Sequence, residues 1–520
     1  MYLYFILESD VRPASQAMLN QFQILREKFG VEPMVTYGLP NFSQYAMYGM
    51  FKTTSPSVLT FPPDLAHLVK LFRNQTYGGV CSVYQRHCTT MDEDVAYAAR
   101  YNKSGRKWKT IKFYDLNSMY VSTYNKDMPT SRGIDWECDE KGSFTPKLIS
   151  DNQYSLECCQ WMDYMSNDTR FINTSGERQE IQHTWNGDEV KIGPYPVDGY
   201  CVVDNIPYAL QYDGCHVHSC DDCQVVFPKD DHERDRYVST KCVLIKIKSC
   251  EWKKIMKAGD LPTPRISPFL YDRSIAENNV MTAIKNNMVT GFILCDIRPT
   301  PAADKFERIC WPPLFARQKI EYDEIPNWMK KQAKESSFSR ETLIPTMSAD
   351  KLLLHTALVN FYLRNGFHVT KIHRFVEYEG SKCFEDGFEA LYNLRVQATM
   401  NGNGPQASAT KLTGNSFFGK NIQNPEKYTK HTICGEKILK QKSVKPSFQS
   451  SEKLSDSMYE VQEKVLRIKE KYPIHIGNTI LYLSKLLLAE FIVFMEKYLM
   501  VDSWRLLYSG KLHIITCRIS

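Results

Sequence analysis

The sequence predicts a multidomain α+β protein, on the evidence of its length, its composition and the separation of strand-like from helical segments. A chain of 520 residues is too long for one hydrophobic core, so two to four packed units are expected. Hydrophobic residues make up 43% and charged residues 24%, as in ordinary folded proteins, which excludes a disordered chain, a fibre and a small disulfide scaffold. No internal repeat or low-complexity tract is visible.

The overall charge is nearly balanced. Lys and Arg number 65 and Asp and Glu 59, so the net charge is only +6. An excess this small does not predict nucleic-acid binding, and any such function must rest on local motifs.

The expected cellular location follows from two signals that the sequence lacks. Residues 1–7 are apolar but have no basic flank and run into Glu8 and Asp10, unlike a secretory signal peptide. Residues 480–500 are strongly apolar yet include two lysines and two glutamates, so they predict an amphipathic core helix and not a membrane span. We expect an intracellular protein, nuclear or cytoplasmic, not secreted and without a transmembrane segment, whose 16 cysteines are mostly thiols.

The periodicity of apolar residues defines the elements in chain order. Residues 14–29 place apolar side chains on one helical face, and residues 110–114 predict a strand that ends on Asp115. Residues 136–290 are polar, Cys-rich and strand-like, which indicates an inserted α/β module. Residues 430–457 are rich in Ser and Lys and predict a surface loop. Helices are expected at residues 350–365, 388–400, 411–420 and 480–500.

The first chemical motif surrounds the predicted strand end and reads Phe-Tyr-Asp-Leu-Asn-Ser-Met-Tyr at residues 113–120. A carboxylate at a strand end beside a polar turn supplies half of a site for Mg²⁺, which prefers one or two carboxylates plus substrate phosphates. The alternative is an Asp that caps the following helix, because Asp is a preferred N-cap residue. Spacing alone favours the cap.

The second motif reads Lys-Leu-Thr-Gly-Asn-Ser-Phe-Phe-Gly-Lys at residues 411–420. At helical spacing Lys411, Asn415 and Phe418 share one face. Lys411 offers a charge for phosphates, while Phe418 and Gly419 offer a flat surface for a base pair. Arg395, on an earlier helix, could add a second phosphate contact. The alternative is a short structural helix that Gly419 ends as its C-cap.

These two motifs, in this order, resemble motifs A and B of family B DNA polymerases. Motif A of that family reads roughly Asp-x-x-Ser-Leu-Tyr-Pro and motif B Lys-Leu-x-x-Asn-Ser-x-Tyr-Gly. This chain departs from them at Met119, Val121 and Phe418. The long gap between the motifs and residues 214–223 are similar to the protein-primed branch of the family, found in Polinton/Maverick transposons, viruses and linear plasmids. The resemblance extends over nearly the whole chain.

The resemblance implies a polymerase palm and fingers, an inserted α/β endonuclease-like module and a remnant of an RNase H-like exonuclease domain. Residues 1–75 would hold the exonuclease remnant and a linker, and residues 76–135 the first part of the palm with motif A. Residues 136–290 would be the Cys-rich insert and residues 291–430 the palm and fingers with motif B. Residues 431–520 would hold a loop, a palm helix and an incomplete motif C strand.

The chemistry that the resemblance implies is DNA-directed DNA polymerisation, a nucleotidyl transfer, in the replication of a mobile element or virus. Asp115 would be a catalytic Mg²⁺ ligand in a two-metal site, and Tyr120 would stack under the sugar of the incoming nucleotide and exclude a 2′-hydroxyl. Lys411 and Asn415 would hold the triphosphate, with Arg395 as a further contact. The partners would be template and primer DNA, deoxynucleoside triphosphates and a terminal protein that serves as primer.

Two departures limit what the resemblance implies. The family places its second carboxylate in motif C, Tyr-x-Asp-Thr-Asp-Ser, whereas residues 508–513 read Tyr-Ser-Gly-Lys-Leu-His. A two-metal site needs at least two carboxylates, so we expect impaired polymerisation or a non-catalytic DNA-binding remnant. Asp10 resembles the last exonuclease motif, but Ile6 replaces its tyrosine and no exonuclease activity is expected. The chain is therefore expected to be truncated at both ends.

The predicted insert carries a cluster of metal-ligand residue types. Cys215, His218, Cys220 and Cys223 are candidate zinc ligands, since thiolates and imidazoles suit that ion. All four are local in sequence, whereas structural zinc sites usually draw ligand pairs from separated segments. The alternative is a reduced, partly buried Cys/His turn.

The insert also resembles an endonuclease-like module in which Asp198 would be a metal-binding acid. Gln211 stands where that resemblance expects Glu, which counts against a nuclease. A metal-dependent nuclease acting through the insert is therefore the second alternative function.

Overall fold

The computed structural model describes most of the chain in separate stretches. Residues 1–11, which include Asp10 of the expected exonuclease remnant, lie outside the described residues. The described residues are 12–36, 38–50, 66–78, 81–84, 108–115, 119–131, 133–139, 141–148, 155–184, 186, 189–216, 218, 220–224, 231–259, 261–262, 264–265, 267–272, 274–309, 311–331, 340–465, 472–499, 504–509 and 513–519.

An antiparallel six-stranded sheet forms the centre of the molecule. Its strand order is β12-β5-β4-β17-β13-β16, and every neighbouring pair is antiparallel. The strands are β12 (Ile275–Ala276), β5 (Ser143–Leu148), β4 (Ile134–Cys138), β17 (Phe367–Tyr378), β13 (Thr290–Pro299) and β16 (Ala349–His355). Phe292 on β13 is fully buried, and its ring contacts Phe72 and Tyr482 from two helices that cover the sheet.

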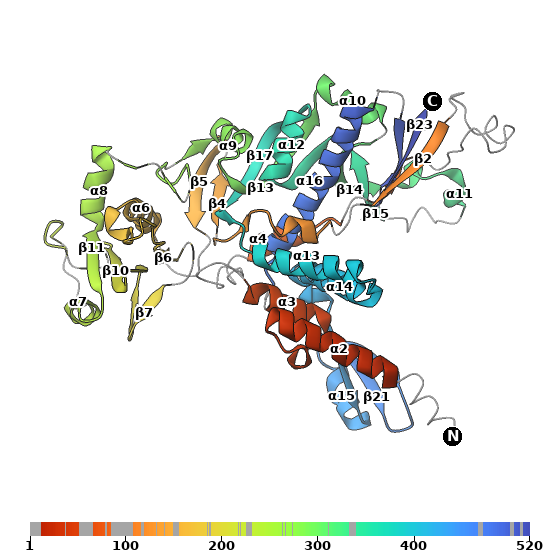
Figure 1. Cartoon of the computed structure of the whole chain (residues 1–520), viewed down its shortest axis with the longest axis horizontal. Helices are drawn as coiled ribbons and strands as arrows, with labels where there is room; N and C mark the ends of the chain where they lie inside the picture. The colour runs from red at the N-terminus through yellow and green to blue at the C-terminus, as the bar shows by residue number, and fades with distance from the viewer. Residues whose placement is uncertain are drawn as a thin grey trace.

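Within the described residues, helices from several parts of the chain pack on or beside this sheet (Figure 1). They are α4 (Ala66–Asn74), α9 (Glu277–Lys285), α12 (Thr356–Arg364) and α16 (Ile474–Tyr498). The helix predicted at residues 350–365 is wrong in its first part, because residues 350–355 belong to strand β16. The physical reason lies in the apolar run Leu352–Leu354. These residues pair with β13 in the sheet and their side chains are all buried, whereas a helix would bury only one of its faces.

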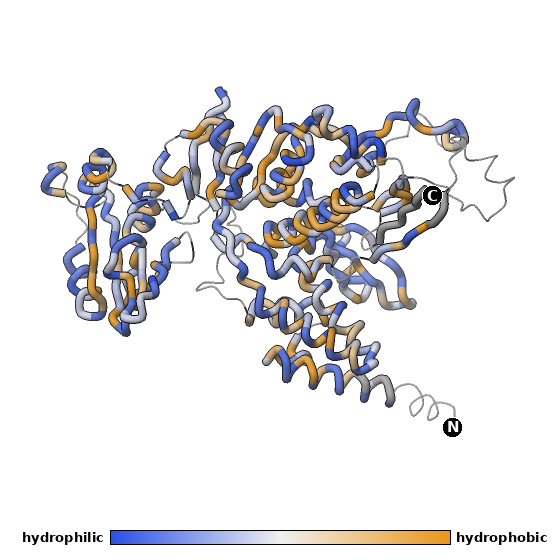
Figure 2. Tube along the Cα trace, turned by 45° about the horizontal axis from the view of Figure 1, so that its top comes forward, coloured by the Kyte–Doolittle hydropathy of each residue, from blue (hydrophilic) through white to orange (hydrophobic). Residues whose placement is uncertain are grey.

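Helix α16 has the length and composition of a membrane-spanning helix, and it is the one such helix among the described residues. Its first half is buried within the protein, including His475, Asn478 and Lys485, which is the behaviour of a core helix. Figure 2 shows hydrophobic residues concentrated along the elements in the middle of the molecule.

A second unit with its own core lies to one side, at the left of Figure 1. Its sheet has the order β11-β10-β9-β6, with β10 and β11 parallel and the other pairs antiparallel. Helix α7 makes the crossover between the parallel strands, and Trp161 and Trp252 fill the core. The elements are α6 (Leu156–Met165), β6 (Gln182–His183), β7 (Val190–Ile192), β8 (Tyr195–Val197), β9 (Gly199–Val203), β10 (Ile206–Asp213), α7 (Asp231–Ser239), β11 (Val243–Lys248) and α8 (Ser249–Ala258).

This side unit is shorter than the insert expected over residues 136–290. Strands β5 and β12 and helix α9 fall within that range and β4 overlaps its start, yet they join or cover the central sheet. The boundary is invisible in the sequence because both units are built from short, polar-flanked strands.

Helices form a third region below the central sheet. They are α2 (Arg12–Phe29), α3 (Leu39–Gly49), α13 (Glu385–Met400) and α14 (Gly404–Asn421). The helix predicted at residues 14–29 is confirmed by α2. The short helix predicted at residues 411–420 is part of the longer α14, which begins with Asn403 as its N-cap.

The surface loop predicted at residues 430–457 is wrong. This segment forms helix α15 (Glu436–Ser443) and, with β21 (Tyr459–Lys464), a sheet in the order β19-β21-β20, where β19 is Thr429–Cys434 and β20 is Phe448–Lys453. Its polar composition is explained by the small size of the sheet, in which only Val461 and Cys434 among the apolar strand residues are buried.

The last sheet joins distant parts of the chain in the order β1-β22-β23-β2. Its strands are β1 (Ser82–Val83), β2 (Trp108–Asp115), β22 (Trp504–Ser509) and β23 (His513–Ile519), and the strand predicted to end on Asp115 is confirmed. The remaining elements are η2 (Pro33–Val35), η5 (Val121–Thr123), β3 (Met128–Pro129), η6 (Thr169–Phe171), η7 (Pro301–Ala303), α10 (Asp304–Arg308), β14 (Leu314–Ile320), η8 (Tyr322–Glu324), α11 (Asn327–Lys330), β15 (Arg340–Thr346), β18 (Gly380–Ser381) and η10 (Pro425–Lys427).

Candidate nucleotide-binding site

Strand β2 ends beside the hairpin formed by β22 and β23. In the antiparallel register Asp115, the last residue of β2, lies opposite His513, the first residue of β23. Ser509, at the end of β22, pairs with Ile514. The backbone therefore brings the predicted metal-binding position to the end of the sheet where β22 turns into β23. Residues 510–512 lie outside the described residues.

Tyr120 is held in a stack with an aromatic ring of helix α14. The centroids of Tyr120 and Phe418 are 4.2 Å apart and the rings lie within 13° of parallel. Burial raises the pKa of Tyr120 to about 12, and its side chain is 2% exposed. The two predicted nucleotide-binding aromatics, far apart in sequence, are thus direct neighbours.

The segment after Tyr120 packs tightly against the middle of α14. A Cβ on Gly414 would lie 2.4 Å from Cγ2 of Val121, so only glycine fits at this position. Tyr124 donates a hydrogen bond to the carbonyl oxygen of Gly414 over 2.6 Å. Sequence reasoning missed Gly414, Val121 and Tyr124. A glycine inside a helix lowers stability by about 1 kcal/mol relative to alanine. A glycine in the middle of a predicted helix was therefore the available sign of a close contact.

A cavity of about 500 Å³ opens between helices α13 and α14 and the start of η5. Arg395, Lys411 and Ser122 line it, but most of its wall is apolar and includes Phe388 and Leu391. Both basic side chains are half-buried, and neither belongs to an ion pair within the described part of the chain. Two cations on one concave wall favour an anionic ligand of nucleotide size.

The other residues predicted on this helix face take different positions. Asn415 is half-buried one turn after Lys411, while Gly419 is exposed and lies inside the last turn of α14. A Cβ at Gly419 would meet no atom within 4 Å, so packing in the protein does not require glycine there. The C-cap assigned to Gly419 is wrong, since the helix continues to Asn421.

The side unit places its predicted zinc ligands differently from the sequence-based expectation. Cys215, Cys220 and Cys223 gather with Cys250, and their sulfur atoms lie within 4.8 Å of one another. His218 is not part of this cluster, and its Nδ1 lies 2.6 Å from Oδ2 of Asp231. The group of possible metal ligands therefore contains Cys250 and not His218; the sequence analysis did not name Cys250, because it lies in another segment, in the first turn of α8.

His218 belongs instead to a network of charged side chains around the buried carboxylate of Asp213. Asp213 accepts from Arg234 at 3.2 Å and from Lys246 at 2.8 Å, and Nε2 of His218 is 4.0 Å from the same carboxylate. Asp235 also pairs with Arg234 at 2.9 Å. Each acid in this network is compensated by a cation of the protein.

Asp198, the expected acid of an endonuclease-like site, lies at the edge of the same unit. Gln211 donates to its Oδ2 over 2.7 Å, and the backbone amide of Tyr212 donates to the same oxygen over 2.7 Å. Burial raises the pKa of Asp198 to about 7. The side-chain amide of Gln211 occupies the position where a second metal-binding carboxylate would be needed, so the geometry does not favour a nuclease.

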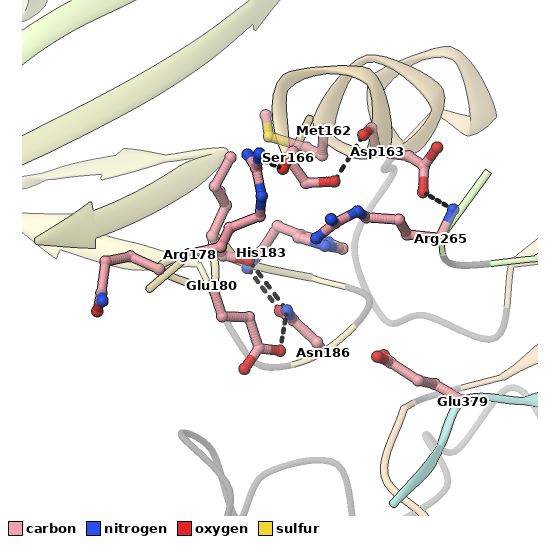
Figure 3. Close-up of a pocket in the computed structure, with 11 residues that line it drawn as sticks. Met162, Asp163, Ser166, Arg178, Glu180, His183, Asn186, Arg265 and Glu379 are labelled. Carbon is pink, nitrogen blue, oxygen red and sulfur yellow. Dashed lines mark hydrogen bonds between the residues drawn. The ribbon is translucent and has the colours of Figure 1, made fainter. Parts of the chain in front are cut away.

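A smaller cavity, of about 200 Å³, marks the joint between the side unit and the central sheet (Figure 3). Asp163 accepts from the backbone amide of Arg265 over 2.8 Å, and Arg178 donates to the carbonyl oxygens of Ser166 and Asp168. Glu379 approaches from the other side. The side chains of Arg178 and Arg265 donate hydrogen bonds within the protein. We therefore regard the cavity as part of the contact between the side unit and the central sheet, and not as a ligand site.

Comparison with known proteins yields likeness only among solved structures. No family model matches the chain, and no curated protein matches it. The chain is similar to Phi29 DNA polymerase complexed with primer-template DNA, with 11% identity and a TM-score of 0.38 over 96% of this chain and 50% of that one. It is similar to Phi29 DNA polymerase complexed with single-stranded DNA, with 10% identity and a TM-score of 0.37 over 98% and 52%.

The chain thus spans about half the length of these Phi29 polymerase structures. Together, the fold and the site define a mixed α/β protein with an antiparallel central sheet and a helical pair that lines a mostly apolar cavity with two basic side chains.

Proposed function

We propose that the protein is a DNA-directed DNA polymerase of the protein-primed branch of family B, from a mobile element or virus, with impaired catalysis. The observation that carries the proposal is the convergence of Arg395 and Lys411 on one cavity beside Ser122, two residues after Tyr120. In this proposal the helical pair α13 and α14 serves as the fingers and the central sheet as the palm. The protein acts in the nucleus or cytoplasm.

The cavity would hold the triphosphate of an incoming deoxynucleotide. Lys411 and Arg395 supply positive charge from two helices, and Asn415 lies one turn further along the same face as Lys411. Tyr120 would lie under the sugar and exclude a 2′-hydroxyl; because its ring is stacked on Phe418 and 2% exposed, this role requires the ring to become accessible when the nucleotide binds. Gly419 leaves open space at the surface where the new base pair would approach.

The two Mg²⁺ ions of the family do not fit the residues of this chain. The register places His513 opposite Asp115, and residues 510–512 are Gly, Lys and Leu. Mg²⁺ requires oxygen ligands, and Asp115 without the two motif C acids supplies one carboxylate, which is too few to hold two such ions. We therefore propose binding of template, primer and nucleotide with weak or no primer extension. A terminal protein as primer belongs to the same proposal.

The nucleotide site can be tested without relying on catalysis. Binding of a fluorescent deoxynucleoside triphosphate is measured by anisotropy in EDTA, so that only the cations of the protein contribute. Lys411→Ala and Arg395→Ala should each weaken binding about tenfold, the loss expected for one charge-assisted phosphate contact. Lys420→Ala is the matched control, because Lys420 lies on the same helix but over the ring of Tyr472. Equal affinities for all four proteins would refute the site.

A second assay distinguishes a weakly active polymerase from a non-catalytic DNA-binding remnant. Primer extension with Mg²⁺ and four deoxynucleotides is run alongside anisotropy with a labelled primer-template. Binding without extension supports the remnant, whereas extension that Asp115→Ala abolishes would show that one acidic position suffices and would overturn the expectation of impairment.

A further inference from the structure

Four cysteines of the side unit form a compact cluster from two separate segments. Cys215, Cys220 and Cys223 lie in the turn after β10, and Cys250 lies in the first turn of α8. Cys215 and Cys220 are buried, Cys250 is half-buried and Cys223 is exposed at the rim. The crossover through α7 and β11 separates the two segments in sequence and returns the chain to the same place.

The spacing of the sulfur atoms matches metal ligation. The Sγ atoms of Cys220 and Cys250 are 3.7 Å apart, and all four lie within 4.8 Å of one another. A zinc ion bound by four thiolates at about 2.3 Å in a tetrahedron separates its sulfurs by about 3.8 Å. All four residues are free cysteines. Four thiols within 4.8 Å of one another, without a bond between them, need only small shifts to reach the edges of such a tetrahedron.

Backbone contacts hold the two segments in this arrangement. The amide of Cys215 donates to the hydroxyl of Ser249 over 3.1 Å, which fixes the turn to the start of α8. The amide of His218 donates to the carbonyl oxygen of Gly214 over 2.9 Å, so the chain curls back on itself between the first two cysteines. The ligands are therefore presented by a turn and a helix start that are already fastened together.

We propose that Cys215, Cys220, Cys223 and Cys250 bind one structural Zn²⁺ ion. A four-thiolate set favours zinc over Mg²⁺ or Ca²⁺, which require oxygen ligands, and a closed tetrahedron leaves no position for a substrate. The ion joins the turn after β10 to helix α8 and so fixes His218 against Asp231 in the charge network. The site is independent of the proposed polymerase function, because none of these residues lines the cavity of Arg395 and Lys411.

The first test is the metal content of the full chain. The 520-residue protein, purified without chelators, should contain one zinc per chain by inductively coupled plasma mass spectrometry. Cys250→Ser should reduce the content severalfold. Cys242→Ser should retain it, because Cys242 is a buried cysteine of the same unit that packs with Val197 and Val238. His218→Ala should also retain it. Loss of zinc in His218→Ala but not in Cys250→Ser would overturn the ligand set.

The second test does not depend on the folding of any variant. Zinc is removed from the unsubstituted protein under reducing conditions and Co²⁺ is titrated in. Four thiolates predict intense thiolate-to-cobalt charge-transfer bands with the visible bands of tetrahedral Co²⁺, saturating at one ion per chain. A cobalt spectrum typical of three sulfur ligands and one nitrogen ligand would refute the proposal. So would the absence of any cobalt bands, if the purified natural protein also contains no zinc.

Discussion

The hydroxyl of Tyr124 donates to the carbonyl oxygen of Gly414 over 2.6 Å, and this bond joins the segment after strand β2 to the middle of helix α14. Both groups are buried, in a cluster that also contains Phe417 and Ile480. The contact fixes the distance between Tyr120 and the helix face that carries Lys411. The geometry of the candidate nucleotide site therefore depends on residues that do not line its cavity.

Gly414→Ala tests how tightly this contact is packed. The added methyl would lie 2.4 Å from Val121, so we expect a loss of about 1–3 kcal/mol in the free energy of unfolding, as for other overpacked cores. Urea denaturation measures the loss. Gly419→Ala on the same helix has open space, and we expect it to be neutral or to stabilise by up to about 1 kcal/mol. Adding Val121→Ala to Gly414→Ala should restore part of the lost stability. Equal stability of Gly414→Ala and Gly419→Ala would contradict the tight packing at Gly414.

Arg374 and Asp135 form a pair within the central sheet whose carboxylate is 1% exposed. Arg374 donates through Nε over 2.7 Å and through a second nitrogen to the other oxygen. Arg374→Ala should cost about 3–5 kcal/mol in unfolding free energy, because it leaves a buried charge without its main partner. In Arg374→Ala/Asp135→Asn the charge is also gone, so we expect much of the loss to be recovered. A double variant no more stable than Arg374→Ala would show that packing of the arginine stem dominates.

Glu377 makes stability depend on pH. It is buried, and burial raises its pKa to about 7 while Trp136 and Ser267 donate to the same carboxylate oxygen. Because the folded-state pKa lies above the unfolded value of about 4.5, its contribution is fully present below that value and is lost as pH rises through 7. Glu377→Gln should abolish this decline and be more stable than the natural protein at pH 8, by on the order of 3 kcal/mol.

The measurement is the urea midpoint at pH 5 and pH 8 for both proteins. Asp198, whose pKa is also raised to about 7, adds a decline over a similar range that remains in the variant. Asp198→Asn is therefore the matched second variant. If Glu377→Gln loses as much stability between pH 5 and pH 8 as the natural protein does, then the carboxyl of Glu377 does not titrate in this range.

Sequence reasoning predicted the local elements of the site, but it did not predict which of these elements lie next to one another. The strand that ends on Asp115 and the shared face of Lys411, Asn415 and Phe418 follow from periodicity, which local backbone geometry enforces. The stack of Tyr120 on Phe418 depends on the packing of distant segments, which no local pattern encodes. The same holds for the cavity that Arg395 shares with Lys411.

The errors have a common physical origin. Residues 350–355 were assigned to a helix because a run of leucines is compatible with either a buried strand or a buried helix. Cys250 was missed because a parallel crossover brings it to the other cysteines from a different segment. Residues 430–457 read as a loop because a small exposed sheet has too few buried positions to produce an alternating pattern.

The hairpin opposite Asp115 allows the impairment of catalysis to be tested by a gain of activity. Motif C of the resembling family would place acids at positions 510 and 512, where this chain has Gly and Leu. The register already brings the start of β23 beside the end of β2. If missing carboxylates are what prevents a two-metal site, Gly510→Asp/Leu512→Asp should gain Mg²⁺-dependent primer extension, because the site would then have the acids that two metals require.

Primer extension is compared with that of Lys511→Asp/His513→Asp, which also adds two acids but at the alternate positions of the same segment. This control should remain inactive, and Asp115→Ala introduced into the active double variant should abolish the gain. Anisotropy with labelled primer-template must show comparable DNA binding in all variants, so that a difference in extension reports catalysis. If both double variants stay inactive while binding DNA and nucleotide, the defect lies outside the hairpin and a non-catalytic role becomes the better account of the chain.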